Sequence, residues 1–172
     1  MNQNDEWYTP KHVLERVRTV MGGIDLDPAS CDIAQNWVKA EKYYTKEDDA
    51  LKRHWYGHVF MNPPYSNALI KRFIKHLVDE YEAGNIKEFI CLTNSGTDTK
   101  WNSMLQKYLQ VYTNGRIRFI QPNGMEKASG SRGQVFTYAG PNPEKFIQQF
   151  TEDGFCWTPN LEFIKANKRR LL

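Results

Sequence analysis

The most constraining feature of the sequence is the alternation of strand-length and helix-length patterns between residues 58 and 92. Residues 58–61 and 89–92 are two apolar runs of strand length. Between them, residues 67–81 place apolar side chains every four positions beside charged ones, as an amphipathic helix does. A helix that connects two buried strands is typical of parallel sheets. The sequence therefore predicts an α/β fold with a mostly parallel central sheet and helices on both faces.

The remaining patterns extend this fold in both directions along the chain. A helix is predicted over residues 10–20, with Thr9 as its N-cap and Pro10 at its first position, where proline is favoured. Consecutive strands between residues 110 and 138, with no helical spacing between them, predict a C-terminal antiparallel hairpin at the end of the sheet. The other predicted helices span residues 32–38, 48–55, 99–109 and 143–150, and the other predicted strands span residues 24–27, 43–44, 110–113, 117–120 and 134–138, with residues 129–133 as a loop.

Length and composition bound the organisation of the chain. With 172 residues, 40% of them hydrophobic, the sequence fits a single domain over residues 1–172 that ends in a tail at about residues 165–172. No apolar stretch has the length or flanks of a signal peptide or a membrane span. Cys31, Cys91 and Cys156 are far apart and lack the spacing of metal ligands. These observations predict a cytoplasmic protein without membrane contact, disulfides or a metal site.

Asn62, Pro63, Pro64 and Tyr65 directly follow one predicted strand, and their residue types suit the methylation of an amino group on a planar ring. The lone pair of such an amino group is delocalised into the ring, so a site must orient it. The Asn62 side-chain oxygen and the Pro63 carbonyl can accept the two amino hydrogens. The prolines stiffen the turn, and Tyr65 offers a face on which a flipped-out base can stack. An ordinary proline turn would explain the prolines but not their polar and aromatic flanks.

A second candidate site follows the first predicted strand. Asp27 ends that strand, and Pro28, Ala29 and Ser30 come directly after it. Because α/β sheets bind ligands at the carboxyl ends of their strands, both motifs are expected at one edge. The Asp27 carboxylate can pair with the ammonium group of S-adenosylmethionine, while the small residues let the cofactor approach the backbone. Taken alone, an Asp-Pro pair is more often a simple turn.

The order of these motifs resembles that of the phage-type DNA N-6-adenine methyltransferase family, often called phage Dam-like proteins. The resemblance covers about residues 7–138. Its elements are Trp7-Tyr8-Thr9-Pro10, Asp25-Leu26-Asp27-Pro28-Ala29, Tyr44-Thr45, Asp48-Asp49-Ala50-Leu51, Asn62-Pro63-Pro64-Tyr65, Thr97-Asp98-Thr99-Lys100-Trp101 and Gly115-Arg116-Ile117-Arg118-Phe119.

The resemblance implies a Rossmann-like fold of the S-adenosylmethionine-dependent methyltransferase type, in which residues 62–65 are catalytic. The cofactor-binding residues that it implies are Trp7, Thr9, Pro10, Asp27, Pro28, Ala29, Asp48, Asp49 and Asn62. The chain departs from general methyltransferases because no Gly-x-Gly follows its first predicted strand. Glu41 and Glu47 are candidates for binding the cofactor ribose.

DNA contacts are predicted downstream of the catalytic motif. Basic residues outnumber acidic ones by nine to five in residues 111–172, and a basic region attracts phosphates, although such an excess is also common on solvated surfaces. Two alternatives stay open: Thr99 can be only a helix N-cap, and arginines on strands are often only solvated. The predicted DNA-binding residues are Thr97, Lys100, Arg116, Arg118 and Arg132, with Lys127 as a further candidate.

The sequence thus predicts an enzyme that methylates the N6 amino group of adenine in DNA, as a monomer or homodimer and without a separate target-recognition domain. If it is phage-encoded, we expect it to work in the host cytoplasm, in protection from restriction or in regulation. The alternatives are an amino-group methyltransferase acting on RNA or on a protein glutamine, because the pocket suits any planar amide-like nitrogen, and an inactive DNA-binding relative.

Overall fold

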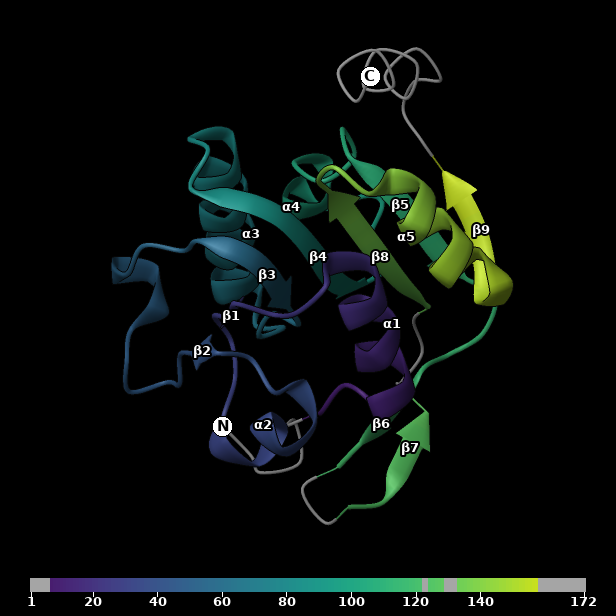
Figure 1. Cartoon of the computed structure of the whole chain (residues 1–172), viewed down its shortest axis with the longest axis horizontal. Helices are drawn as coiled ribbons and strands as arrows, with labels where there is room; N and C mark the ends of the chain where they lie inside the picture. The colour runs from purple at the N-terminus through teal and green to yellow at the C-terminus, as the bar shows by residue number, and fades with distance from the viewer. Residues whose placement is uncertain (1–6, 122–123, 129–132, 158–172) are drawn as a thin grey trace.

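The computed structural model describes residues 7–121, 124–128 and 133–157 (Figure 1). The helices are α1 (Lys11–Met21), α2 (Asp32–Val38), α3 (Asn67–Glu82), α4 (Lys100–Ser103) and α5 (Pro143–Phe150), with 3₁₀ turns at Ala50–Lys52 and Thr151–Asp153. The strands are β1 (Leu26–Asp27), β2 (Lys42–Tyr43), β3 (Gly57–Met61), β4 (Ile86–Asn94), β5 (Leu109–Thr113), β6 (Arg118–Ile120), β7 (Glu126–Ala128), β8 (Gln134–Ala139) and β9 (Gly154–Trp157). The predicted limits of α2 and α5 are confirmed, and those of α1, α3 and β3 differ by at most one residue at either end.

Within the described residues, one sheet has the strand order β2-β1-β3-β4-β8-β5-β9. The pairings among β2, β1, β3 and β4 are parallel, whereas β8 is antiparallel to β4 and β5, and β9 is antiparallel to β5. The mixed α/β class is therefore confirmed, but the prediction of a mostly parallel sheet is wrong. The reason lies between β5 and β8, where the described residues form no crossover helix. A chain without such a helix returns to its neighbour in the opposite direction.

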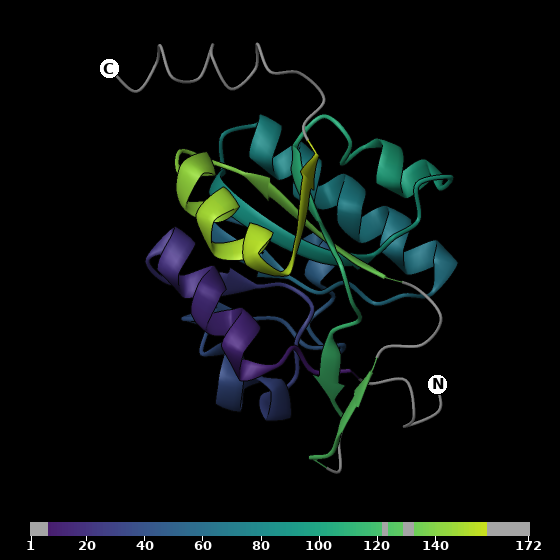
Figure 2. The same cartoon turned by 90° about the vertical axis from the view of Figure 1, so that its right-hand side faces the viewer.

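Of the strands predicted to form the C-terminal antiparallel hairpin, residues 110–113 and 134–138 do pair antiparallel, as β5 and β8 inside the main sheet, whereas residues 117–120 pair elsewhere, with β7, which the sequence did not predict. β6 and β7 pair with each other in an antiparallel sheet of their own, which extends away from the main sheet (Figure 2). Backbone hydrogen bonds of 2.8 and 2.9 Å in both directions join Ile120 of β6 to Tyr8. In the described residues, β2 and β9 are the edge strands of the main sheet, and no sequence pattern predicted β9. Residues 129–132 of the predicted loop lie outside the described residues.

Helices cover both faces of the main sheet, as predicted (Figures 1 and 2). On one face, Leu14 of α1 and Phe146 of α5 belong to an apolar cluster that includes Ile90 of β4. On the other face, Ile74 of α3 belongs to a second cluster that includes Phe89. Successive residues of a strand point to opposite faces, so the neighbours Phe89 and Ile90 divide between the two layers. This burial explains why the run over residues 89–92 is apolar throughout.

Two predicted helices are much shorter in the structure. Residues 48–55 contain a single 3₁₀ turn, because Asp49 adopts a left-handed backbone conformation with φ 47° and Trp55 is fully buried. Residues 99–109 are helical only in α4, since Leu109 already pairs with β8 as part of β5. In both segments, contacts with distant parts of the chain override the local helical pattern.

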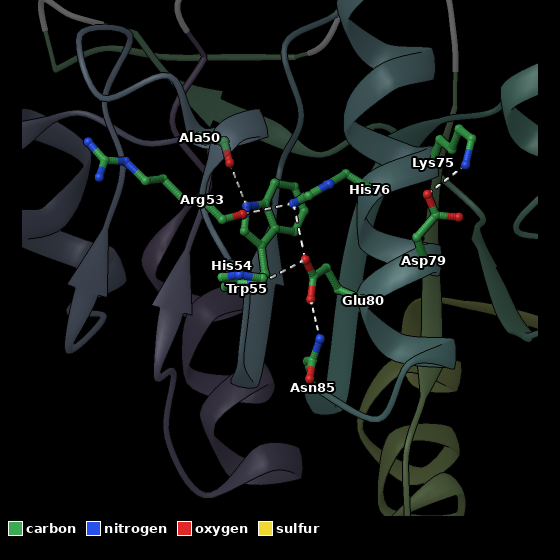
Figure 3. A network of polar contacts seen from close by, with 9 residues as sticks. All are labelled: Ala50, Arg53, His54, Trp55, Lys75, His76, Asp79, Glu80 and Asn85. Carbon is green, nitrogen blue, oxygen red and sulfur yellow. Dashed lines mark hydrogen bonds and ion pairs between the residues drawn. The ribbon is translucent and has the colours of Figure 1, made fainter.

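A polar network connects the loop before β3 to α3 (Figure 3). The Glu80 carboxylate accepts a hydrogen bond from the Asn85 side-chain amide at 2.6 Å. The ring nitrogens His54 Nδ1 and His76 Nε2 each lie 3.6 Å from the other Glu80 oxygen. His76 Nε2 also lies 3.0 Å from the Arg53 carbonyl oxygen. The network lies at the amino end of β3 and holds this loop against the helix that follows the strand.

Trp55 adds apolar packing to the same contact between the loop before β3 and α3. Its Nε1 donates to the Ala50 carbonyl at 2.9 Å, and its ring packs at 4.7 Å, edge to face, against His76. We expect Trp55→Ala to lower the free energy of unfolding by about 3–5 kcal/mol, because it leaves a cavity in the core. Urea denaturation measures this loss. Tyr56→Ala is the matched control, since this neighbour is 47% exposed and should lose at most about 0.5 kcal/mol. Equal losses in both variants would contradict the core assignment.

Candidate active site

β1 and β3 lie side by side in the sheet, and the chain leaves them in opposite directions. From β1 it continues through α2 to β2, and from β3 through α3 to β4. α2 and α3 pack on opposite faces, because their buried side chains belong to different apolar clusters. Open α/β sheets bind ligands outside the carboxyl ends of two such strands. Asp27 ends β1 and Asn62 follows β3, so both sequence motifs flank this position.

The segment before α1 holds the Asn62 amide in one orientation. Asn62 Nδ2 donates to the Trp7 carbonyl oxygen at 3.3 Å and to Thr9 Oγ1 at 3.5 Å. The amide nitrogen therefore faces these two acceptors, and the side-chain oxygen faces the other way. The Tyr65 hydroxyl donates to that oxygen, Asn62 Oδ1, at 3.1 Å. The acceptor predicted in the motif is thus directed toward Tyr65.

Tyr65 is partly accessible, and its hydroxyl is held by two hydrogen bonds. The residue is 36% exposed, whereas its hydroxyl lies between Asn62 Oδ1 and the Leu92 carbonyl oxygen, the latter at 3.5 Å. Burial raises the pKa of Tyr65 far above its usual range, and the nearby Cys91 adds to the increase. The hydroxyl therefore stays protonated and donates. The two prolines of the motif are buried and half-buried, which fixes the turn between the asparagine and the tyrosine.

Asp27 is a buried carboxyl group, 3% exposed. It accepts hydrogen bonds from the Ala29 backbone N–H at 3.2 Å and from Gln35 Nε2 at 3.4 Å, and the same Gln35 amide donates to Ser30 Oγ at 2.7 Å. Among the described residues, its partners are neutral groups. Burial raises the pKa of Asp27 from 3.8 to about 6, although the hydrogen bonds from Ala29 and Ser30 lower it. A cation beside Asp27 would favour the ionised form and lower this pKa again.

Thr9 and Pro10 precede α1, and the start of this helix differs from the predicted one. Pro10 is the N-cap residue of α1, so the prediction of Thr9 as N-cap and Pro10 as the first helical residue is wrong by one position. The physical reason is that the buried Thr9 hydroxyl is turned toward Asn62 instead of the helix. The rings of Trp7 and Phe119 of β6 pack edge to face, with centroids 6.3 Å apart.

Comparison with known proteins identifies the family of the chain. The sequence profile of the DNA N-6-adenine-methyltransferase (Dam) family matches residues 1–151. The chain belongs to this family. The chain is also similar to the DNA N-6-adenine-methyltransferase of Escherichia phage T1, with 35% identity over 96 residues. That region is 54% of this chain and spans 38% of the length of the phage T1 protein. The family resemblance expected from the ordered motifs is confirmed.

Asp48 and Asp49, which the resemblance to the Dam family places near the cofactor, are engaged within their own loop. The backbone N–H and the hydroxyl of Thr45 donate to Asp48 at 2.8 and 2.9 Å. Asp49 forms an ion pair with Lys52 at 2.8 Å. The hydrogen bonds from Thr45 and Lys52 lower the pKa of Asp48 and Asp49, respectively. The loop follows β2, the neighbour of β1, but no described hydrogen bond or ion pair joins these two carboxylates to either motif.

Glu41 and Glu47, the two candidates for binding the cofactor ribose, lie beyond opposite ends of β2. Glu41 precedes this strand, and its backbone N–H donates to the Ile24 carbonyl at 2.9 Å. Glu47 follows the strand and is exposed. Since both motifs lie at carboxyl ends of strands, the position of Glu47 fits this edge better than that of Glu41.

The segment after β4 resolves one of the open alternatives. Thr97 and Lys100 are exposed at this carboxyl edge, where they were predicted to contact DNA. Thr99 is the N-cap of α4, because its hydroxyl oxygen accepts the Asn102 backbone N–H at 3.3 Å. The same hydroxyl donates to the Gly96 carbonyl at 2.7 Å. The N-cap interpretation of Thr99 is therefore confirmed.

The predicted DNA-binding arginines lie on the segment that follows β5. Arg116 and Arg118 are both exposed. Arg118 lies 3.7 Å from the Glu126 carboxylate on the facing strand of the hairpin. Arg132 and the side chain of Lys127 lie outside the described residues, so the structure says nothing about their predicted role.

The described residues contain no group of three or more histidine, cysteine, aspartate or glutamate side chains that could hold a metal ion. In the same part of the chain, every helix is too short or too polar to cross a membrane. Cys31, Cys91 and Cys156 are free thiols, and burial raises the pKa of Cys91 far above its usual range.

Sequence reasoning missed two groups at the site. Gln35 binds both Asp27 and Ser30, but it lies on α2 and carries no local signal of this role, because only the packing of α2 brings it to the end of β1. The Leu92 carbonyl binds the Tyr65 hydroxyl. Its place at the end of the apolar run over residues 89–92 could have indicated the same sheet edge.

Asp27 should make the stability of the protein depend on pH. Its pKa is about 6 in the folded state and 3.8 ordinarily, so the folded state binds more protons between these values and loses stability as pH rises through them. We expect Asp27→Asn to raise the free energy of unfolding at pH 8 by about 1–3 kcal/mol. Near pH 4 the variant and the wild type should converge. Denaturation at both pH values tests this, with the exposed Asp79→Asn as control. A variant less stable than wild type at pH 8 would contradict the cause assigned to the shift.

Proposed function

We propose that the chain transfers a methyl group from S-adenosylmethionine to the N6 amino group of adenine in DNA. The observation that carries the proposal is the orientation of the Asn62 amide, whose nitrogen is bound by Trp7 and Thr9 and whose oxygen faces Tyr65. Membership of the Dam family supports the same reaction. The sheet would then be a Rossmann-like variant whose ligand edge lies between β1 and β3.

Asn62 and Pro63 would orient the target nitrogen. Asn62 Oδ1 and the Pro63 carbonyl would each accept one amino hydrogen, which favours a tetrahedral nitrogen with its lone pair directed at the methyl group. A carbonyl oxygen has two lone pairs, so Oδ1 can accept an amino hydrogen beside the Tyr65 hydroxyl. While the target nitrogen takes the methyl group that the cofactor would supply, these two oxygens would hold its amino hydrogens, and one amino proton would then leave to water. The same acceptors stabilise the positive charge that develops on the nitrogen.

Tyr65 would hold the base itself. Extruding a base from a duplex costs a few kcal/mol, and stacking on an aromatic ring offsets part of this cost. The 36% exposure of Tyr65, with its hydroxyl anchored at Asn62 and Leu92, supports this role because one part of the residue is accessible while the other is fixed.

Asp27 fits the ammonium group of S-adenosylmethionine. When bound, this cofactor supplies an electrophilic methyl group on a sulfonium. The Asp27 carboxylate is buried among neutral groups, and its raised pKa indicates that an adjacent cation would be favourable. Pro28 and Ala29 are small and directly follow it, so they leave room for the cofactor beside the backbone. We retain Trp7, Thr9, Pro10, Asp48 and Asp49 as proposed neighbours of the cofactor on the family resemblance.

Trp7 and Thr9 would have a second role as positioning residues. Their carbonyl and hydroxyl oxygens accept hydrogen bonds from Asn62 Nδ2 and thus prevent the amide from rotating its nitrogen toward the base. An amide rotated by half a turn would present a donor where the reaction needs an acceptor. The N-terminal segment would therefore determine the chemical character of the pocket as well as its shape.

Asn62→Ala should remove the reaction without removing the fold. We expect the rate of methyl transfer to DNA to fall by about 10²- to 10³-fold, because a group that stabilises the transition state is lost. The free energy of unfolding should fall by only about 1 kcal/mol. Transfer of tritiated methyl groups to DNA, RNA and protein extract measures the effect and separates the alternatives.

Asn36→Ala on the exposed surface of α2 is the control and should keep wild-type transfer. Undiminished transfer to DNA by Asn62→Ala would refute the catalytic assignment. Wild-type transfer to RNA or protein glutamine in place of DNA would establish one of the alternative substrates, and transfer to none of them would indicate an inactive relative.

Asp27→Ala should weaken cofactor binding. We expect the dissociation constant of S-adenosylmethionine, measured by calorimetry, to rise about 30-fold, because the ammonium loses a buried partner. For the wild type, affinity should fall as pH decreases below about 6, since Asp27 must be ionised to pair with the cation. The alanine variant should lack this dependence. An unchanged dissociation constant in Asp27→Ala would exclude Asp27 from the cofactor site.

A further inference from the structure

A cleft with a volume of about 570 Å³ lies between α1 and the chain that enters β6. His12 and Arg16 of α1 contribute to one wall, and Arg116 and Arg118 contribute to the other. Apolar side chains, among them Phe136, also line it. Cationic groups from segments 100 residues apart in sequence therefore face one open space.

Two acidic side chains also line the cleft, but they hold its arginines weakly. Glu152 lies 3.9 Å from Arg16, and Glu126 lies 3.7 Å from Arg118. The side chains of these glutamates are 75% and 58% exposed. The Arg16 and Arg118 side chains are 25% and 67% exposed. Ion pairs of this length contribute little to stability when water competes for the exposed carboxylate. An incoming phosphate can replace either carboxylate, and a guanidinium group can bind two phosphate oxygens at once.

The cleft lies at the same edge of the sheet as the Asn62 motif. β8 is antiparallel to both β4 and β5, so β5 runs in the direction of β3 and β4. Residues 114–116 follow β5, so they lie beyond the carboxyl edge of the sheet. Asn62, which follows β3, lies at the same edge. The Tyr8–Ile120 backbone pairing places the hairpin next to the segment that holds Asn62. Figure 2 shows the hairpin extending past this edge.

We propose that this cleft binds the sugar–phosphate backbone of the DNA strand next to the target adenine. The inference rests on the proposed function, because it assigns the DNA a path from the Asn62 pocket to the hairpin. Arg16 and His12 of α1 are the new members of this surface, and no sequence motif indicated them. Cations spread along two walls suit a chain of phosphates better than a single small anion.

The salt dependence of DNA binding tests the proposal. Each phosphate contact contributes about 0.9 to the slope of log Kd against log salt concentration. We expect the triple variant R16Q/R116Q/R118Q to lower this slope by about 2 to 3 and to weaken binding of a fluorescent duplex at least about tenfold near 0.15 M salt. K11Q is the matched control, since Lys11 is an exposed cation of α1 that does not line the cleft. An unchanged slope in the triple variant would overturn the proposal.

A second variant is expected to strengthen DNA binding, so its effect cannot be explained by loss of the folded structure. E126Q/E152Q removes the carboxylates that compete with DNA for the arginines, and we expect it to bind the duplex several-fold more tightly. Weaker or equal binding would count against the cleft. If the cleft instead serves free phosphate, calorimetry with inorganic phosphate would detect binding that the triple variant loses, while its DNA slope would stay unchanged. That result would also overturn the proposal.

Binding and methyl transfer separate this inference from the proposed function. Asn62→Ala should bind the duplex with the wild-type slope, because Asn62 contacts the base and not the phosphates. A wild type that methylates DNA while the triple variant keeps its slope would refute the cleft alone. A wild type that binds DNA with the expected slope, but methylates nothing, would refute the proposed reaction alone.

Discussion

The parallel pairing of β1 with β3 places the two motif-bearing strand ends next to each other, and the site depends on this contact. The strands approach closely because position 57 is glycine with φ +68°, where a Cβ atom would lie 2.1 Å from Asp25 Oδ2. The Asp25 carboxylate accepts the His58 backbone N–H at 2.8 Å, and the Asp25 N–H donates to the His58 carbonyl at 2.9 Å. The short β1 thus depends on side-chain as well as ladder hydrogen bonds for its register.

Beside this contact, the Asn62 amide is held by a segment that is distant in the sequence. Asn62 follows β3, its nitrogen is bound by the segment before α1, and that segment pairs with β6 through Tyr8 and Ile120. Asp27 adds a second constraint, since burial makes its ionised form unfavourable in the folded state. A bound cation would stabilise the ionised carboxylate and so offset the unfavourable effect of burial. Under the proposed function, stability and cofactor binding would therefore be opposed at Asp27.

The antiparallel strands of the sheet determine which segment follows β5 at the carboxyl edge of β1 and β3. Since β8 lies between β4 and β5, the end of β5 projects on the side where β1 and β3 end. The connection that leaves β5 carries the arginines and the hairpin, whereas a crossover helix there would have taken the chain back across a face of the sheet. The departure from an all-parallel topology thus brings the basic segment to the candidate active site.

The sequence by itself determined the elements whose signal is local and the chemistry of their ends. The four-residue period of α3, the strand-length runs of β3 and β4, and the limits of α2 and α5 were all predictable, as were the motifs after β1 and β3. Tertiary structure decided the rest. Whether residues 48–55 and 99–109 stay helical depends on burying Trp55 and on pairing Leu109, and the direction of β8 depends on its neighbours. The orientation of Asn62 depends on acceptors 53 and 55 residues away. Periodicity reports which face of one element is buried, but it carries no information about which distant element will cover that face.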